Sequence, residues 1–159
     1  MAASKAQKDQ KDGQPSAGQF SAEERAAMKA RAAELKAEGV RASAAEKATA
    51  DEAAVQAKIA EMPEPDRSAA ARLQSIVTEA APELQPKLYY GQPGWAKAGK
   101  VIVFFRSGIV DKARYSTLGF SVQANLDEGG GFWPTSFAVE QITDDIAETI
   151  ARLVKKAVS

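Results

Sequence analysis

The sequence contains no cysteine and no histidine, and each absence excludes whole classes of site. Without cysteine, the chain has no disulfide, no thiolate nucleophile and no sulfur ligand for a metal. Without histidine, it lacks the usual general base near neutral pH and the commonest ligand of zinc, copper and nickel. Serine–histidine triads and zinc-protease motifs are therefore excluded, and we expect a protein that is not an enzyme and uses no cofactor.

The sequence also lacks a long apolar run and an excess of charge of either sign. No stretch approaches the ~20 apolar residues of a membrane-spanning helix, and the first residues contain no apolar segment of a signal peptide. These features predict a cytoplasmic protein with no membrane partner. Lysine and arginine together number 21, as do aspartate and glutamate, so the formal net charge is zero. A neutral chain has no overall field that draws it onto nucleic acid.

Composition divides the chain into four parts. Residues 1–19 have almost no large apolar side chains and are expected to form a disordered arm. Residues 20–39 begin with a capping box, end at a glycine and are predicted to form an N-terminal helix. Residues 40–50 are mostly small and polar and are interpreted as a linker. The remainder, residues 51–159, is predicted to be the folded domain.

The pattern of the folded domain is helices, then strands, then a helix. Apolar residues recur with helical spacing on both sides of Pro63, and a short strand is expected at Leu88–Tyr90, broken by a loop that contains Trp95. Val101–Phe105 is apolar on both faces, which is typical of a central strand, and Thr143 is the predicted N-cap of the last helix. This order predicts an α+β fold, with a mostly antiparallel sheet and the N- and C-terminal helices packed on one side.

Two tryptophans are predicted to lie in loops, where a large aromatic side chain needs either a packing partner or a ligand. If the two loops lie at the same end of the sheet, they form one pocket for a small molecule or a protein partner. The residues predicted to bind this ligand are Tyr90, Trp95, Arg114 and Trp133. The alternative is that both indoles pack against the domain.

Acidic residues are concentrated on the predicted helices. Clustered carboxylates suit hard cations that are held weakly through oxygen, so the helices carry a candidate metal site. The candidate ligands are Glu79, Glu83, Asp144, Asp145 and Glu148. The alternative, which we favour, is that these acids form ordinary solvated helix faces and helix N-terminal charges.

The stretch from Lys87 to Arg114 has the opposite bias, with six basic residues against one acidic residue and with aromatic residues interleaved. Basic groups beside exposed aromatic rings are what phosphates and stacked bases require, so a nucleic-acid-binding module is a third alternative. The other interpretation is that the aromatic residues form core and that the lysines protect sheet edges. The neutral net charge favours that second interpretation.

Several short motifs occur in an order that resembles the bacterial YdhG-like family. They are Ile59–Arg67, Lys87–Pro93, Gly99–Phe105, Ala113–Phe120, Asn125–Asp127 and Trp133–Phe137. The resemblance implies an α+β layout similar to frataxin. Most of the family has no assigned activity, and one branch is described as an iron chaperone, so the resemblance implies iron as the candidate metal partner of the helix carboxylates. Family members often carry a histidine in the strand that here reads Lys112–Ser116, so iron binding by this chain requires a site made of oxygen ligands alone.

Overall fold

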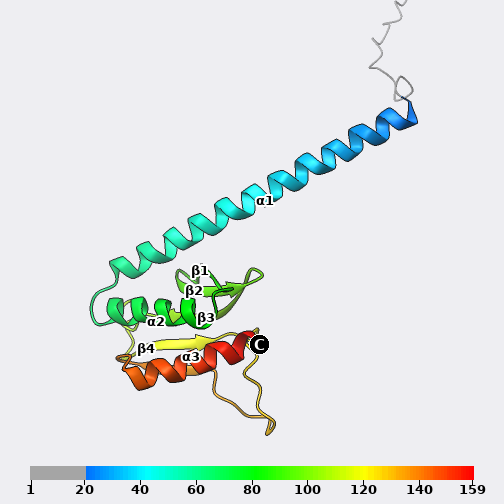
Figure 1. The fold of residues 1–159 in the computed structure, drawn as a ribbon. Coiled ribbons are helices and arrows are strands. Elements are labelled where there is room, and N and C mark those ends of the chain that lie inside the picture. The colour runs from blue at the N-terminus through cyan, green and yellow to red at the C-terminus, as the bar shows by residue number, and fades with distance from the viewer. Residues whose placement is uncertain (1–20) are drawn as a thin grey trace, which may run out of the picture. The chain divides into compact units, whose positions relative to one another are not determined.

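The structure is a computed structural model that describes residues 21–159, and Figure 1 shows its elements. The expected disordered arm, residues 1–19, lies outside the described residues. The chain divides into two units, Met1–Ser43 and Ala44–Ser159. The second unit contains the sheet and the core, and it begins somewhat before the predicted domain start at residue 51.

The first helix, α1, runs without interruption from Ala22 to Glu61, a length of 40 residues. Its start is capped as predicted, because Ser21 Oγ accepts a hydrogen bond from the N–H of Glu24 at 3.1 Å. The predicted linker at residues 40–50 is wrong, since these residues are helical. Alanine is the best helix former and a single glycine costs only about 1 kcal/mol, so the alanine-rich sequence on both sides outweighs Gly39.

Five strands form one sheet in which each strand pairs antiparallel with its neighbour in the sequence, in the order β1-β2-β3-β4-β5. The strands are β1 (Gln85–Tyr89), β2 (Gln92–Lys97), β3 (Lys100–Arg106), β4 (Ser116–Phe120) and β5 (Ser136–Val139). The central position predicted for the Val101–Phe105 strand is confirmed. The loop predicted after Tyr90 is wrong, because β2 occupies it and forms a tight hairpin with β1.

Two further helices, α2 (Asp66–Ala80) and α3 (Asp144–Val158), pack together on one side of the sheet (Figure 1). Thr143 caps α3 as predicted, and its Oγ1 accepts from the N–H of Ile146 at 3.3 Å. The core contains Leu73 and Val77 from α2, residues such as Val103 and Phe105 from the sheet, and others from α1 and α3. The α+β fold with helices on one side of an antiparallel sheet is thus confirmed.

Candidate functional site

The structure does not bring together the four residues that were predicted to share a pocket. Tyr90 lies in the turn between β1 and β2, and Arg114 lies in the loop between β3 and β4, so both are at the end of the sheet where β3 finishes. Trp133 precedes β5, whose register with β4 places it at the opposite end. A common pocket is therefore wrong, because an antiparallel meander puts successive connections at alternate ends.

Trp95 lies within β2 and is a core residue. Its side chain is only 1% exposed, and its strand neighbours are Pro86 on β1 and Val103 on β3. Within residues 21–159 its indole N–H has no hydrogen-bond partner. Trp133, which is half-buried, packs against the same core. Of the two interpretations drawn from the sequence, packing is the correct one for both indoles.

A buried carboxylate lies at the end of the sheet that carries Arg114. Asp66, the first residue of α2, is 6% exposed. Its Oδ1 accepts a hydrogen bond from Ser116 Oγ at 2.9 Å. Its Oδ2 accepts from Ser107 Oγ at 2.5 Å and from the N–H of Ile109 at 3.2 Å. Because three donors satisfy this buried charge, the cluster fixes the loop between β3 and β4 to the start of α2.

A partly exposed ion pair holds the same loop from its other side. Arg106 donates from Nε and Nη2 to the two carboxylate oxygens of Asp111, both at 2.9 Å, and from Nη1 to the carbonyl of Tyr90 at 3.1 Å. Gln92 accepts from the N–H of Ser107 and donates to Asp111. The hydrogen bonds from Arg106 hold the pKa of Asp111 below its ordinary value and raise the pKa of Arg106.

Arg114 lines a polar pocket of about 340 Å³ above the Asp66 cluster. Its guanidinium lies over the ring of Tyr115, 5.1 Å from the centroid, and Glu140 lines the same pocket. A cation, a carboxylate and a phenol at one pocket suit a small polar molecule better than an apolar one. Of the four predicted ligand-binding residues, Arg114 alone lines this pocket.

The five candidate metal ligands are dispersed. Glu79 and Glu148 line a cleft of about 240 Å³ between α2 and α3, whereas Asp144 pairs with Arg72 at 2.5 Å. The other two are exposed: Glu83 and Asp145. Across residues 21–159 no group of three or more acidic side chains is placed to hold a metal ion. The iron interpretation therefore has no geometric support from this part of the chain.

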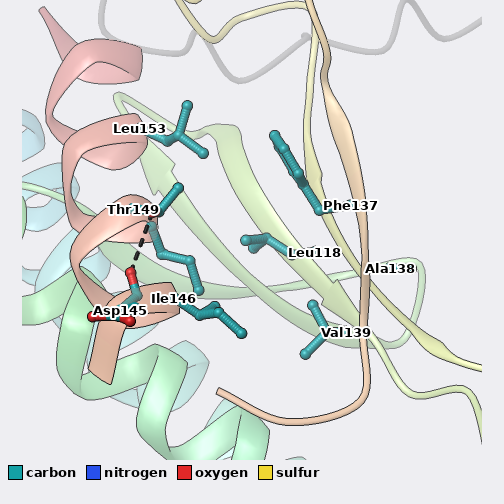
Figure 2. Close-up of a pocket in the computed structure, with 9 residues that line it drawn as sticks. Leu118, Phe137, Ala138, Val139, Asp145, Ile146, Thr149 and Leu153 are labelled. Atoms are coloured by element: carbon teal, nitrogen blue, oxygen red, sulfur yellow. Dashed lines mark hydrogen bonds between the residues drawn. The ribbon is translucent and has the colours of Figure 1, made fainter. Parts of the chain in front are cut away.

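An apolar groove of about 310 Å³ lies between α3 and the outer strand β5 (Figure 2). From one side, Ile146, Thr149 and Leu153 of α3 point into it. From the other side, Phe137 and Val139 of β5 face it, with side chains from the interior of the domain at its floor. Ile146 is 39% exposed, so this apolar side chain has no complete cover within the described residues.

The strand that forms one wall of this groove, β5, is the last strand of the sheet, and within residues 21–159 its outer edge has no strand partner. The N–H of Phe120 donates to the carbonyl of Thr135 at 2.8 Å, which makes alternate residues from 135 onward the hydrogen-bonded positions opposite β4. The backbone N–H and C=O groups of Ser136 and Ala138 therefore point away from the sheet. Both residues are exposed. An extended segment laid along this edge would find backbone partners at both positions.

Sequence reasoning missed this groove because its signal is divided between two elements. The helical spacing of Ile146, Ile150 and Leu153 indicates an apolar face on α3, whereas Phe137 lies on the strand before that helix. What the sequence does not show is that α3 and β5 line opposite sides of one groove. None of the helices within residues 21–159 is long and apolar enough to cross a membrane.

Comparison of the sequence and structure with protein-family profiles, curated proteins and solved structures finds no match. The resemblance to the YdhG-like family therefore stays a prediction, and the function must be argued from the geometry.

Proposed function

We propose that this protein is a binding domain that accepts an extended segment of a protein partner between β5 and α3. One observation carries the proposal: the unpaired backbone edge at Ser136 and Ala138 lies directly beside an apolar groove lined from both sides. A peptide that adds to a sheet edge obtains affinity from main-chain hydrogen bonds and specificity from pockets for alternate side chains. In this protein the free backbone edge of β5 and the apolar groove lie next to each other.

The pleat of the sheet supports this arrangement. Side chains of successive strand residues point to opposite faces, and Phe137 and Val139 point to the side covered by α3. In a strand added outside β5, alternate side chains would point to that same side. Across the groove, these side chains would face Ile146, Thr149 and Leu153 of α3. The groove therefore suits a segment with aliphatic residues at alternate positions.

Charge at one end of the groove favours a basic residue in the partner. Glu140 follows β5 directly, and Asp145 lines the groove where α3 begins. Both carboxylates are exposed. A lysine or arginine of the partner, next to its aliphatic residue, would complement them, and exposed charges of this kind mainly set specificity and association rate. The partner is thus an extended segment that is apolar at alternate positions and basic at one end.

The sequence analysis expected a small molecule or a protein as the partner, and we propose that the partner is this extended protein segment. Membership of the YdhG-like family and a cytoplasmic location are compatible with it and are proposed with it. The iron-chaperone alternative is not favoured by any cluster of carboxylates within residues 21–159.

Replacement of Ala138 by proline tests the proposal most directly. The N–H of Ala138 points outward and makes no bond with β4, and proline is tolerated on edge strands, so Ala138→Pro should fold. It removes one donor from the free edge. The matched control is Ala138→Thr, which keeps the N–H and favours strand. The probe is a displayed library of random peptides of about eight residues, long enough for one strand.

Two measurements decide the outcome: the binding of selected peptides to the three proteins, and the oligomeric state. Selected peptides should bind the wild type and Ala138→Thr equally and bind Ala138→Pro about tenfold or more weakly, as expected for one lost hydrogen bond in a buried interface. Equal binding to the proline variant, or no selected peptide at all, contradicts the proposal. A dimer seen by sedimentation that Ala138→Pro abolishes would assign the edge to a second copy of this chain and would also contradict it.

A further inference from the structure

The face of the sheet opposite α2 and α3 carries a cluster of three aromatic rings. The rings of Tyr89 and Phe104 have centroids 4.9 Å apart, and the rings of Tyr89 and Tyr90 meet edge to face at 4.6 Å. Phe104 pairs with Gly94 and Gly119, and it does not belong to the core beneath the helices. The cluster is therefore separate from the groove between α3 and β5.

Gly119 makes this surface flat. A Cβ atom built at this position would lie 2.2 Å from Cζ of Phe104, so the ring of Phe104 occupies the space that any other residue on β4 would need. The ring lies across the neighbouring strand instead of standing away from the sheet. The aromatic platform formed by Tyr89, Tyr90 and Phe104 therefore extends from β1, across β2 and β3, to β4.

Tyr90 is in a backbone conformation that disfavours its own side chain. With Gly91 it forms a two-residue hairpin turn in which both φ angles are positive, 48° and 78°. Such turns favour asparagine or glycine at the first position, and a bulky residue there is an outlier. The ring is nonetheless 81% exposed and therefore contributes little to the core. A costly conformation that displays an aromatic ring in solvent is a signature of a functional residue.

Basic residues are concentrated in the part of the chain that forms the sheet. The strands and links from Gln85 to Ser121 carry six basic residues and one acidic residue. Lys87 lies on β1 opposite Gly94, and Lys112 and Arg114 lie in the loop next to the turn of Tyr90. Asp111 is the one acidic residue of this stretch and is paired with Arg106, while Glu140, from outside the stretch, lines the same pocket as Arg114. Although the formal net charge of the whole chain is zero, the part that forms strands β1 to β4 carries a net positive charge.

We infer that this aromatic platform binds single-stranded nucleic acid, with bases stacked on Tyr90 and the adjoining rings and with phosphates beside the surrounding lysine and arginine side chains. Stacking on aromatic rings accepts any base because every base has a π face, and a basic surround supplies the phosphate contacts. A duplex has its bases already stacked within the helix and cannot use the rings, so the surface selects unpaired strands.

The test uses Tyr90→Asn, which removes the ring and supplies a residue that the turn prefers. Stability should therefore be retained or increased, so that weaker binding cannot be attributed to unfolding. The probe is a fluorescent oligothymidylate of about 12 nucleotides, within the ~4–16 that one such surface covers. Tyr90→Trp keeps a ring, and Val122→Ala alters a residue that is 97% exposed outside the platform.

Fluorescence anisotropy should show that Tyr90→Asn weakens binding about 5- to 150-fold, the effect of losing one stacked base, whereas Tyr90→Trp and Val122→Ala bind like the wild type. With about three phosphate contacts, raising the salt from roughly 50 to 200 mM should weaken binding more than tenfold. Absence of binding, equal binding of Tyr90→Asn, or equal competition by a duplex or heparin would overturn the inference.

Discussion

Asp66 and Ser116 are separated by 50 residues in the sequence, yet Ser116 Oγ donates a 2.9 Å hydrogen bond to Asp66 Oδ1 inside the protein. Ser107 and Ile109 donate to the other oxygen of the same carboxylate. The first turn of α2, the loop after β3 and the start of β4 are thereby joined at one buried charge. The polar pocket that contains Arg114 lies directly above this junction.

Replacement of Asp66 by asparagine should destabilise the protein by about 2–3 kcal/mol. Hydrogen bonds to a charged group are strong, and the amide nitrogen of asparagine cannot accept the hydrogen bond that the replaced carboxylate oxygen accepted. Urea unfolding followed by circular dichroism measures the change. Glu79→Gln, at an exposed acidic position on the same helix, is the control and should change stability by less than about 0.5 kcal/mol. If the two variants change the free energy of unfolding equally, the hydrogen bonds to Asp66 do not stabilise the fold.

Gly108→Ala should be strongly destabilising, by more than about 2 kcal/mol, because the added Cβ would clash with backbone atoms and the clash can be relieved only by moving the backbone. A Cβ at this position would lie 2.5 Å from the carbonyl oxygen of Tyr115. Gly130→Ala is the matched control, since nothing lies within 4 Å of its Cβ position. Thermal unfolding of both variants gives the comparison, and a Tm for Gly108→Ala within error of the control would contradict the close approach of these two segments.

Acid should weaken the ion pair between Arg106 and Asp111. Since Arg106 holds the pKa of Asp111 below its ordinary value of 3.8, the pair stabilises the fold above that pH, and this contribution is lost as the pH falls through the folded-state pKa. The pair is partly exposed, so its contribution is about 1 kcal/mol at most. Between about pH 6 and pH 3, Asp111→Asn should therefore lose less stability than the wild type. If urea titrations show that the wild type and Asp111→Asn lose the same stability over this pH range, the ion pair does not stabilise the fold.

Gly39→Ala should strengthen α1 by about 1 kcal/mol, the difference in helix propensity between the two residues. Gly39 has nothing within 4 Å of its Cβ position, so the substitution adds no clash. Hydrogen exchange should show slower exchange of the amides near this residue, with unchanged exchange in β3. Unchanged exchange near Gly39 would instead support the linker that the sequence suggested for residues 40–50.

The sequence predicts the elements with strong local signals and fails where a tertiary contact or a neighbouring segment decides. The cap at Thr143 and the central strand Val101–Phe105 are local patterns, and both are confirmed. Gly39 looked like a helix end because glycine often ends helices, but the segment that follows is rich in alanine and contains no proline to stop the helix. Gln92–Trp95 looked like a loop because of its proline and glycine, and hairpin pairing with β1 made it a strand.

The candidate sites were harder to predict than the fold for a related physical reason. Whether Trp95 binds a ligand or packs in the core depends on whether its segment forms a loop or a strand that faces the helices, and composition does not reveal this. Asp66 gave no sequence signal beyond its place at the start of a helix, where an acidic residue is ordinary. Its importance comes from Ser107 and Ser116, two hydroxyls supplied by segments that no motif connects to it.

The strand order described above has a consequence for how the protein folds. Each strand pairs only with the strands before and after it in the sequence, so the sheet can grow one hairpin at a time with little chain to close at each step. The contact between α2 and α3 is different, because the whole meander lies between the two helices. We expect the hairpins to form early and the helix pair to dock last, so substitutions at Val77 and Val154 should mainly accelerate unfolding, whereas those at Val103 should slow folding.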